Sequence, residues 1–138
     1  MEKMQKRAGL LAVLFLLTAF LAGCSFQKEE EEKTKLEFTV VDEERLPEEL
    51  KEIVTEKKKE AFKLTYADGG YIYLCIGYGE QKTGGYSIAV NDLYATENAI
   101  YLDTNLIGPK EAGEAGSAPS FPYLVIKTPF MDKTVVFD

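Results

Sequence analysis

The 138-residue chain contains no histidine and no tryptophan, and its only cysteines are Cys24 and Cys75. Without an imidazole there can be no Ser-His-Asp triad, no Cys-His couple and no histidine-ligated metal ion. The commonest hydrolytic chemistries are therefore excluded. The residue inventory predicts no metal site and no cofactor.

Composition leaves three catalytic arrangements open: a pair of carboxylates, a Ser-Lys couple and a lone cysteine. Acids are numerous enough that some pair must lie close by chance, and Ser87, Ser117 and Ser120 have no lysine at a characteristic spacing. None of the three arrangements has a local signature, so we expect that the protein is not an enzyme. A calcium loop of the EF-hand pattern is also absent, which counts against a cation receptor.

The first 23 residues have the pattern of an export signal. Three cations, Lys3, Lys6 and Arg7, precede an uncharged and mostly apolar run from Ala8 to Ala22. This order is typical of a secretory leader. A permanent membrane span is the alternative, but it needs about 20 apolar residues and the run is shorter.

The leader ends in Leu21-Ala22-Gly23-Cys24, which resembles the lipobox of bacterial lipoproteins. In that motif small residues precede an obligatory cysteine, whose sulfur accepts a diacylglyceryl group. The resemblance implies cleavage between Gly23 and Cys24, lipidation of Cys24, and localisation at the extracytoplasmic face of the cell membrane. The alternative is an ordinary leader whose cysteine falls near the cleavage site.

The charge of the processed chain excludes one class of partner. Removal of residues 1–23 leaves 13 basic and 22 acidic residues, a net charge of −9. Phosphate backbones are bound by clustered Lys and Arg, whereas the basic run Lys57-Lys58-Lys59 is flanked by Glu56 and Glu60. We expect no nucleic-acid partner, and we expect contact with the membrane through the lipid on Cys24.

A linker and one folded domain follow the predicted cleavage site. Residues 24–33 are polar and acidic, with little to bury, and they predict a disordered linker. Residues 34–138 are enough for one small domain and too few for two. Within it, Cys75 lies in an apolar segment and is predicted to be a buried, unreactive thiol.

Period-two alternation predicts that the domain consists mainly of strands. The expected strands span residues 34–41, 61–67, 71–78, 86–94, 99–107, 123–128 and 134–137. Residues 71–78 are apolar on both faces, which indicates a central strand. Asp68-Gly69-Gly70 predicts a hairpin turn, and residues 108–119 predict the longest loop.

One amphipathic helix is expected after the first strand. Pro47 suits its first turn, Glu48 and Glu49 complement its positive end, and the lysine run complements its negative end. One apolar stripe at helical spacing consists of Leu46, Leu50, Ile53 and Val54. One helix among many strands predicts an α+β domain that is mainly an antiparallel sheet. Whether that sheet curls toward a barrel or toward a sandwich is left open.

Two separated segments carry a family resemblance. Gly79 to Tyr86 reads Gly-Glu-Gln-Lys-Thr-Gly-Gly-Tyr, and Phe121-Pro122-Tyr123 follows some 35 residues later. Over about residues 61–130 the chain resembles the PrcB C-terminal domain family, whose signature is Gly-x-Lys-Pro-Thr-Gly-Gly-Tyr. Lys82 stands here where that family has its proline. The resemblance implies a non-catalytic binding or stabilising module, such as an accessory subunit of a surface protease complex.

The candidate residues for turn formation or partner binding are Thr83, Gly84, Gly85, Tyr86 and Tyr123. Consecutive glycines suit a tight turn and also a ligand cradle, and the sequence favours the turn. The eight tyrosines fit core packing or a partner-binding patch. The expected partner is an envelope or secreted protein, which the resemblance implies could be a protease. A small-ligand receptor of the cell envelope is the alternative function.

Substitution of Cys24 tests the lipid anchor. Cys24→Ala should move the protein from the membrane fraction to the soluble fraction, because the variant has no sulfur to carry acyl chains that each contribute about 0.8 kcal/mol per buried methylene. The measurement is fractionation followed by immunoblotting, with Ser25→Ala as the neighbouring control. Unchanged membrane retention of the Cys24 variant would count against the anchor.

Overall fold

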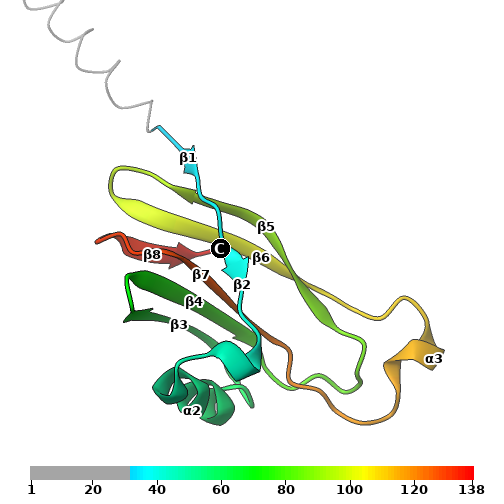
Figure 1. The fold of residues 1–138 in the computed structure, drawn as a ribbon. Helices are drawn as coiled ribbons and strands as arrows, with labels where there is room; N and C mark the ends of the chain where they lie inside the picture. Colours follow the sequence, from blue (N-terminus) through cyan, green and yellow to red (C-terminus); the bar gives the residue numbers. More distant parts are fainter. Residues whose placement is uncertain (1–31) are drawn as a thin grey trace, which may run out of the picture. The chain divides into compact units, whose positions relative to one another are not determined.

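The computed structural model describes residues 32–138. The predicted leader, Cys24 and nearly all of the predicted linker lie outside the described residues, so the structure does not bear on them. The strands are β1 (Thr34–Lys35), β2 (Thr39–Val40), β3 (Ala61–Asp68), β4 (Tyr71–Tyr78), β5 (Ser87–Ala95), β6 (Ala99–Ile107), β7 (Tyr123–Pro129) and β8 (Thr134–Phe137) (Figure 1). The helices are η1 (Glu43–Arg45), α2 (Glu48–Lys57) and α3 (Ala112–Ala115). None of these helices is long and apolar enough to cross a membrane.

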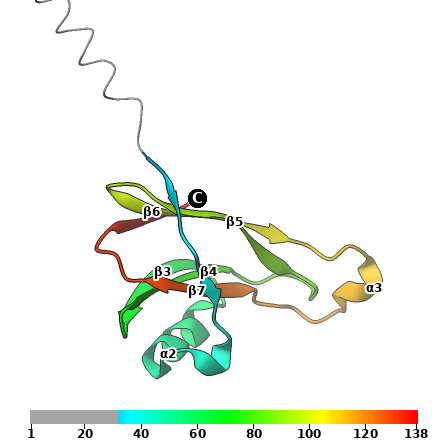
Figure 2. The same cartoon turned by 45° about the horizontal axis from the view of Figure 1, so that its top comes forward.

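The strands form two separate four-stranded sheets. The first sheet has the order β1-β5-β6-β8 and the second has the order β2-β7-β4-β3. Neighbouring strands are antiparallel except β6 and β8, which run parallel. Figure 2 shows the two sheets as layers, with α2 on the far side of the second sheet. The predicted α+β domain, mainly antiparallel and with one amphipathic helix, is confirmed, and the sheets do not close into a barrel.

Strand β4 lies inside the second sheet, as its double-sided apolar sequence predicts. It pairs with β3 on one side and β7 on the other, and residues 72–77 are all buried. The hairpin between β3 and β4 turns at Gly69 and Gly70, whose φ angles are +60° and +84°. Positive φ at both central residues is what a type I′ hairpin turn requires, and glycine supplies it without steric cost.

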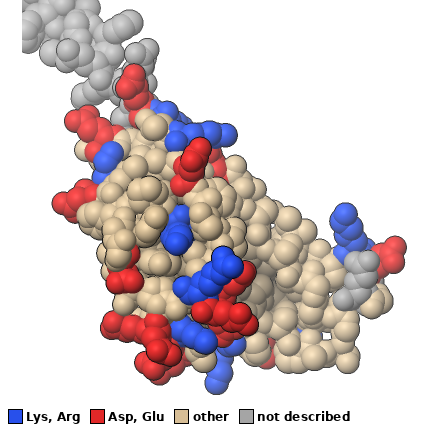
Figure 3. Space-filling view, in the orientation of Figure 1, with Lys and Arg blue, Asp and Glu red and all other residues tan. Residues whose placement is uncertain are grey.

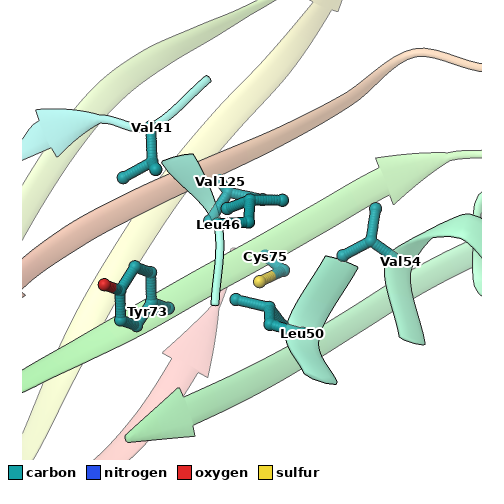
Figure 4. Packing of buried hydrophobic residues seen from close by; sticks show 7 residues of the cluster. All are labelled: Val41, Leu46, Leu50, Val54, Tyr73, Cys75 and Val125. Carbon is teal, nitrogen blue, oxygen red and sulfur yellow. The ribbon is translucent and has the colours of Figure 1, made fainter. Parts of the chain in front are cut away.

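The two faces of β4 contribute to two different cores. One core lies between α2 and the second sheet, and Figure 4 shows Cys75 of β4 beside Leu50 of α2. Its buried members are Val41, Leu46, Leu50, Val54, Tyr73, Cys75 and Val125. The other core lies between the sheets, and its buried members are Ile72, Leu74, Leu93, Ala95, Ile100, Leu102 and Ile126. Since side chains alternate along a strand, a single strand can supply both cores.

Helix α2 packs through the apolar stripe that the sequence indicates. Leu50 and Val54, one turn apart, are 0% and 2% exposed, and Leu46 before the helix is also buried. The charged face of the helix points to solvent. One polar contact joins helix and sheet, because the Tyr66 hydroxyl donates a hydrogen bond to the Glu49 carboxylate over 3.0 Å.

One predicted strand is wrong, and the reason is tertiary. Residues 34–41 form two short strands in different sheets, β1 at the edge of the first and β2 at the edge of the second. The chain crosses between the sheets from Leu36 to Phe38, where the Leu36 N–H donates to the Leu93 carbonyl and the Thr128 hydroxyl donates to the Glu37 carbonyl. The alternating pattern persists across this step, so the sequence does not mark it.

Smaller differences concern boundaries and loops. Strand β5 begins and ends one residue later than predicted, and it contains an irregularity between Val90 and Asp92. The predicted loop over residues 108–119 contains the single turn α3. The other predicted strands are confirmed to within two residues at each end.

Truncation of Leu50 should destabilise the domain. Leu50→Ala removes a fully buried side chain from the core under α2, and such changes cost about 2–5 kcal/mol. The free energy of unfolding measured by urea denaturation checks this. Lys51→Ala, on the exposed side of the same turn, should lie within about 0.5 kcal/mol of the wild type. Equal effects of the two substitutions would contradict the packing of α2 on the sheet.

Candidate binding site

The Thr83-Gly84-Gly85-Tyr86 segment lies in the connection between β4 and β5 and is held against the loop that carries α3. The Gly84 N–H donates to the Ala115 carbonyl over 2.7 Å, and the Ser120 hydroxyl donates to the Thr83 carbonyl over 2.6 Å. Gln81 and Ser120 also exchange two backbone hydrogen bonds. The segment and the loop therefore brace each other.

The fold requires glycine at positions 84 and 85 for two different reasons. Gly85 has φ of +80°, in the left-handed region that side chains disfavour. A Cβ on Gly84 would lie 3.0 Å from the Ala115 carbonyl oxygen. The Gly84 N–H is already used by that carbonyl, so it is not directed at a ligand. This geometry favours the turn over the ligand cradle.

The tyrosines among the candidate residues lie in different surroundings. Tyr86 is half-buried, and its ring lies 3.4 Å from where a Cβ on Gly108 would be. Tyr123 packs against the core under α2. Burial, and then the negative charge of Glu43 and of an ionised Cys75, raises the pKa of Tyr123. Packing thus assigns Tyr123 to the helix side of the second sheet rather than to the segment at 83–86.

The remaining tyrosines divide between core and surface. Tyr73 is 7% exposed and makes an edge-to-face contact with Tyr66, with ring centroids 6.3 Å apart. Tyr71 is 41% exposed, and the Lys127 ammonium lies 4.6 Å from the centroid of its ring. On the first sheet, Tyr94 and Tyr101 stack at 5.0 Å. Core packing therefore accounts for Tyr73, while Tyr71 is available to a partner.

Cys75 is buried, as predicted, and carries no disulfide. Burial in apolar surroundings raises the pKa of its thiol to about 12. The thiolate is the nucleophilic form, so a thiol that stays protonated at neutral pH is inert. Within residues 32–138, no group of three or more Cys, Asp or Glu side chains could hold a metal ion.

An open groove of about 500 Å³ lies where β3 and β4 face the first sheet. Its lining is mostly apolar and includes Phe62, Ile76 and Tyr78 from the second sheet and Thr104 from β6. The Tyr78 and Thr104 hydroxyls are hydrogen-bonded at 2.7 Å and bridge the two sheets. Two charged residues also line the groove, Lys63 of β3 and Asp138, which follows β8.

Sequence reasoning missed this groove because its residues come from three separate strands. One signal was present. Ala61, Lys63, Thr65 and Ala67 alternate with the larger apolar residues of β3, and in the structure all four are exposed although they lie on the face turned toward the first sheet. Small and polar residues at these positions indicate that the first sheet does not cover β3.

The fold and the groove define a class: a small, mainly β domain of two packed sheets with an open apolar groove along one side. Residues 72–129, from β4 to β7, match the model of the family described as PrcB C-terminal. The matched range includes both segments on which the resemblance was based, and it supports a PrcB-like domain in this part of the chain. The comparison with curated proteins gave no match, and neither did the comparison with solved structures.

Substitution of Gly84 tests the brace between the connection and the loop. Gly84→Ala should lower the free energy of unfolding by about 1–3 kcal/mol, because the new Cβ forces the Ala115 carbonyl away. Gly113→Ala is the matched control, since a Cβ there meets open space. Urea denaturation compares the two. A Gly113 variant as unstable as the Gly84 variant would contradict the assigned contact.

The raised pKa of Cys75 predicts an alkaline loss of stability. The folded thiol has a pKa of about 12, above the ordinary value of 9.0, so the folded state binds this proton more tightly than the unfolded state does. Its contribution is complete below about pH 9 and is lost as the pH rises toward 12. Between pH 8 and 10.5 the wild type should lose about 2 kcal/mol relative to Cys75→Ala in urea unfolding. If the free energy of unfolding has the same pH dependence in the two proteins, burial does not raise the pKa of the Cys75 thiol.

Proposed function

We propose that the protein is a membrane-anchored, extracytoplasmic lipoprotein whose domain binds or stabilises another envelope or secreted protein. The proposed setting is a surface protease complex, in which the protein is an accessory subunit. The match of residues 72–129 to the PrcB C-terminal family carries the proposal, because it covers the strands from β4 to β7 and the connection between them.

The surface of the domain supports a protein partner. Several large apolar side chains are exposed, among them Val40 at 54%, Phe130 at 51% and Ile107 at 44%. Figure 3 shows that the surface between the end with α2 and the tip with α3 is largely uncharged on this face. These side chains lie on β2, at the end of β6 and after β7, where each offers apolar area that a protein partner can bury.

The environments of the candidate nucleophiles support a non-catalytic role. The Cys75 thiol has no exposed surface and its pKa is about 12. The Ser120 hydroxyl donates a hydrogen bond to the Thr83 carbonyl, which helps to hold the β4–β5 connection against the loop that carries α3. These groups stabilise the fold in the geometry observed.

The anchor part of the proposal rests on the sequence. The cationic start, the apolar run and the Leu21-Ala22-Gly23-Cys24 motif agree with lipidation at Cys24. Two or more acyl chains hold a protein at a bilayer far more firmly than one. The anchored domain would then bind its partner at the outer face of the membrane.

A small-ligand receptor of the cell envelope is the second candidate, and the groove favours it. Its volume of about 500 Å³ falls in the usual range for small-molecule sites, about 300–1,000 Å³. The groove is open along one side, however, whereas such sites usually bury most of the ligand. An extended polypeptide fits this shape better.

Co-purification from solubilised membranes separates the two functions. The full chain, cross-linked in intact cells and captured with an antibody raised against the domain, should retain one envelope or secreted protein at near-stoichiometric amount, because an accessory subunit is held in a stable assembly. Quantitative mass spectrometry of the purified material provides the measurement, with Cys24→Ala as the unanchored control. A bound small molecule with no protein partner would favour the receptor and reject the accessory module.

A further inference from the structure

Strand β8 covers only part of the edge of β6. The two strands pair in parallel from Ala99 with Thr134 to Leu102 with Phe137, whereas β6 continues to Ile107. Beyond Leu102, the described chain supplies no strand on that side of β6. The first sheet is therefore one strand narrower along residues 103–107.

The hydrogen bonds of β6 show which of its backbone groups face the open side. The Ala99 carbonyl accepts from the Thr96 N–H toward β5, and the Leu102 carbonyl accepts from the Asp138 N–H toward β8. Successive residues of a strand point their backbone groups to opposite sides. Thr104 and Leu106 therefore direct their N–H and carbonyl groups toward the open side, where residues 32–138 provide no backbone partner.

The open edge runs along the groove described above. Thr104 lines the groove from β6, and Ala61, Lys63 and Ile76 line it from the second sheet. A strand added beside Thr104 and Leu106 would cover the uncovered face of β3. Its inward side chains would contact Ile76 and Tyr78, which line the groove from the face of β4 turned toward the first sheet.

The edge of β6 also lacks the features that protect sheet edges from pairing. Inward-facing charges, lysine and proline are the usual protections. Strand β3, the free edge of the second sheet, carries such a charge at Lys63, whose side chain faces the first sheet and is exposed. Asp103, at the start of the open part, lies on the face of β6 opposite to Thr104 and so points away from the groove. Residues 104–107 carry no charge and no proline.

We propose that an extended segment of the partner protein binds as an added strand beside Thr104 and Leu106, above the groove. This inference rests on the proposed function and names its contact surface. Affinity comes from main-chain hydrogen bonds, and apolar side chains at alternate positions fill the groove, as in other cases of strand addition. Two charged residues line the groove, Lys63 from β3 and Asp138 after β8, so the segment carries its acidic residue opposite Lys63 and away from Asp138.

The probe is a pair of seven-residue peptides in which valine and threonine alternate around a central glutamate or a central lysine. Each is titrated into the full-length protein in detergent micelles. The glutamate peptide should slow hydrogen exchange at the Thr104 and Leu106 amides by about tenfold or more at saturation. It should also bind about fivefold or more tightly than the lysine peptide, because one meets an opposite charge and the other a like charge.

Two variants make the assignment specific. Lys63→Glu, at an exposed position, should reverse the preference between the peptides, whereas Lys51→Glu makes the same charge change on α2 and should leave the preference unaltered.

Leu106→Pro removes an N–H that the added strand needs, at a position where proline is tolerated because it lies on the free edge. Loss of peptide binding with retained cooperative unfolding is expected for this variant.

Several results would overturn the inference. They are unprotected Thr104 and Leu106 amides at saturating peptide, a peptide preference that Lys63→Glu leaves unchanged, or concentration-dependent pairing of this edge between two copies of the chain. A small molecule in the groove with no peptide binding would also overturn it. If the envelope partner still co-purifies with Lys63→Glu and Leu106→Pro at wild-type amount, the groove is rejected while the accessory function stands. If no partner co-purifies with the wild type, the accessory function itself fails.

Discussion

Strand β4 is buried on both faces, and both cores of the domain are built on it. Leu74 faces the first sheet and Cys75 faces α2, and neither has exposed surface. Each face must therefore be covered by a separate layer, one a sheet and the other a helix. The three-layer order of first sheet, second sheet and α2 follows from this requirement.

The covering layers differ in width, and the difference creates the groove. Helix α2 covers β3 and β4 on its side, where Phe62, Leu64 and Tyr66 pack against the helix core. On the opposite side the first sheet stops at β8, a strand of four residues. The inner face of β3 therefore carries small and polar side chains that remain exposed. The open site is thus a consequence of unequal layers rather than of a specialised loop.

The connection between β4 and β5 has a different role from the groove. Its contacts with Ala115 and Ser120 hold the long loop before β7 in place, and the Tyr78 N–H donates to the Pro122 carbonyl just before β7 begins. Because β7 pairs directly with β4, this brace continues the pairing of the two strands at the end of the second sheet where the groove lies. The residues with the clearest family resemblance thus stabilise the fold next to the groove.

Local features of the sequence determined the elements. The two-sided apolar run placed β4 inside a sheet, the glycine pair set the hairpin after Asp68, and the stripe from Leu46 to Val54 set the packing face of α2, because these signals depend on neighbours in the chain. Only the tertiary structure decided that residues 34–41 divide between two sheets and that β8 runs parallel to β6 and stops short of its end. It alone brought Lys63, Tyr78 and Thr104 to one groove. Strand pairing joins residues far apart in the chain, and no local pattern records which edges remain unpaired.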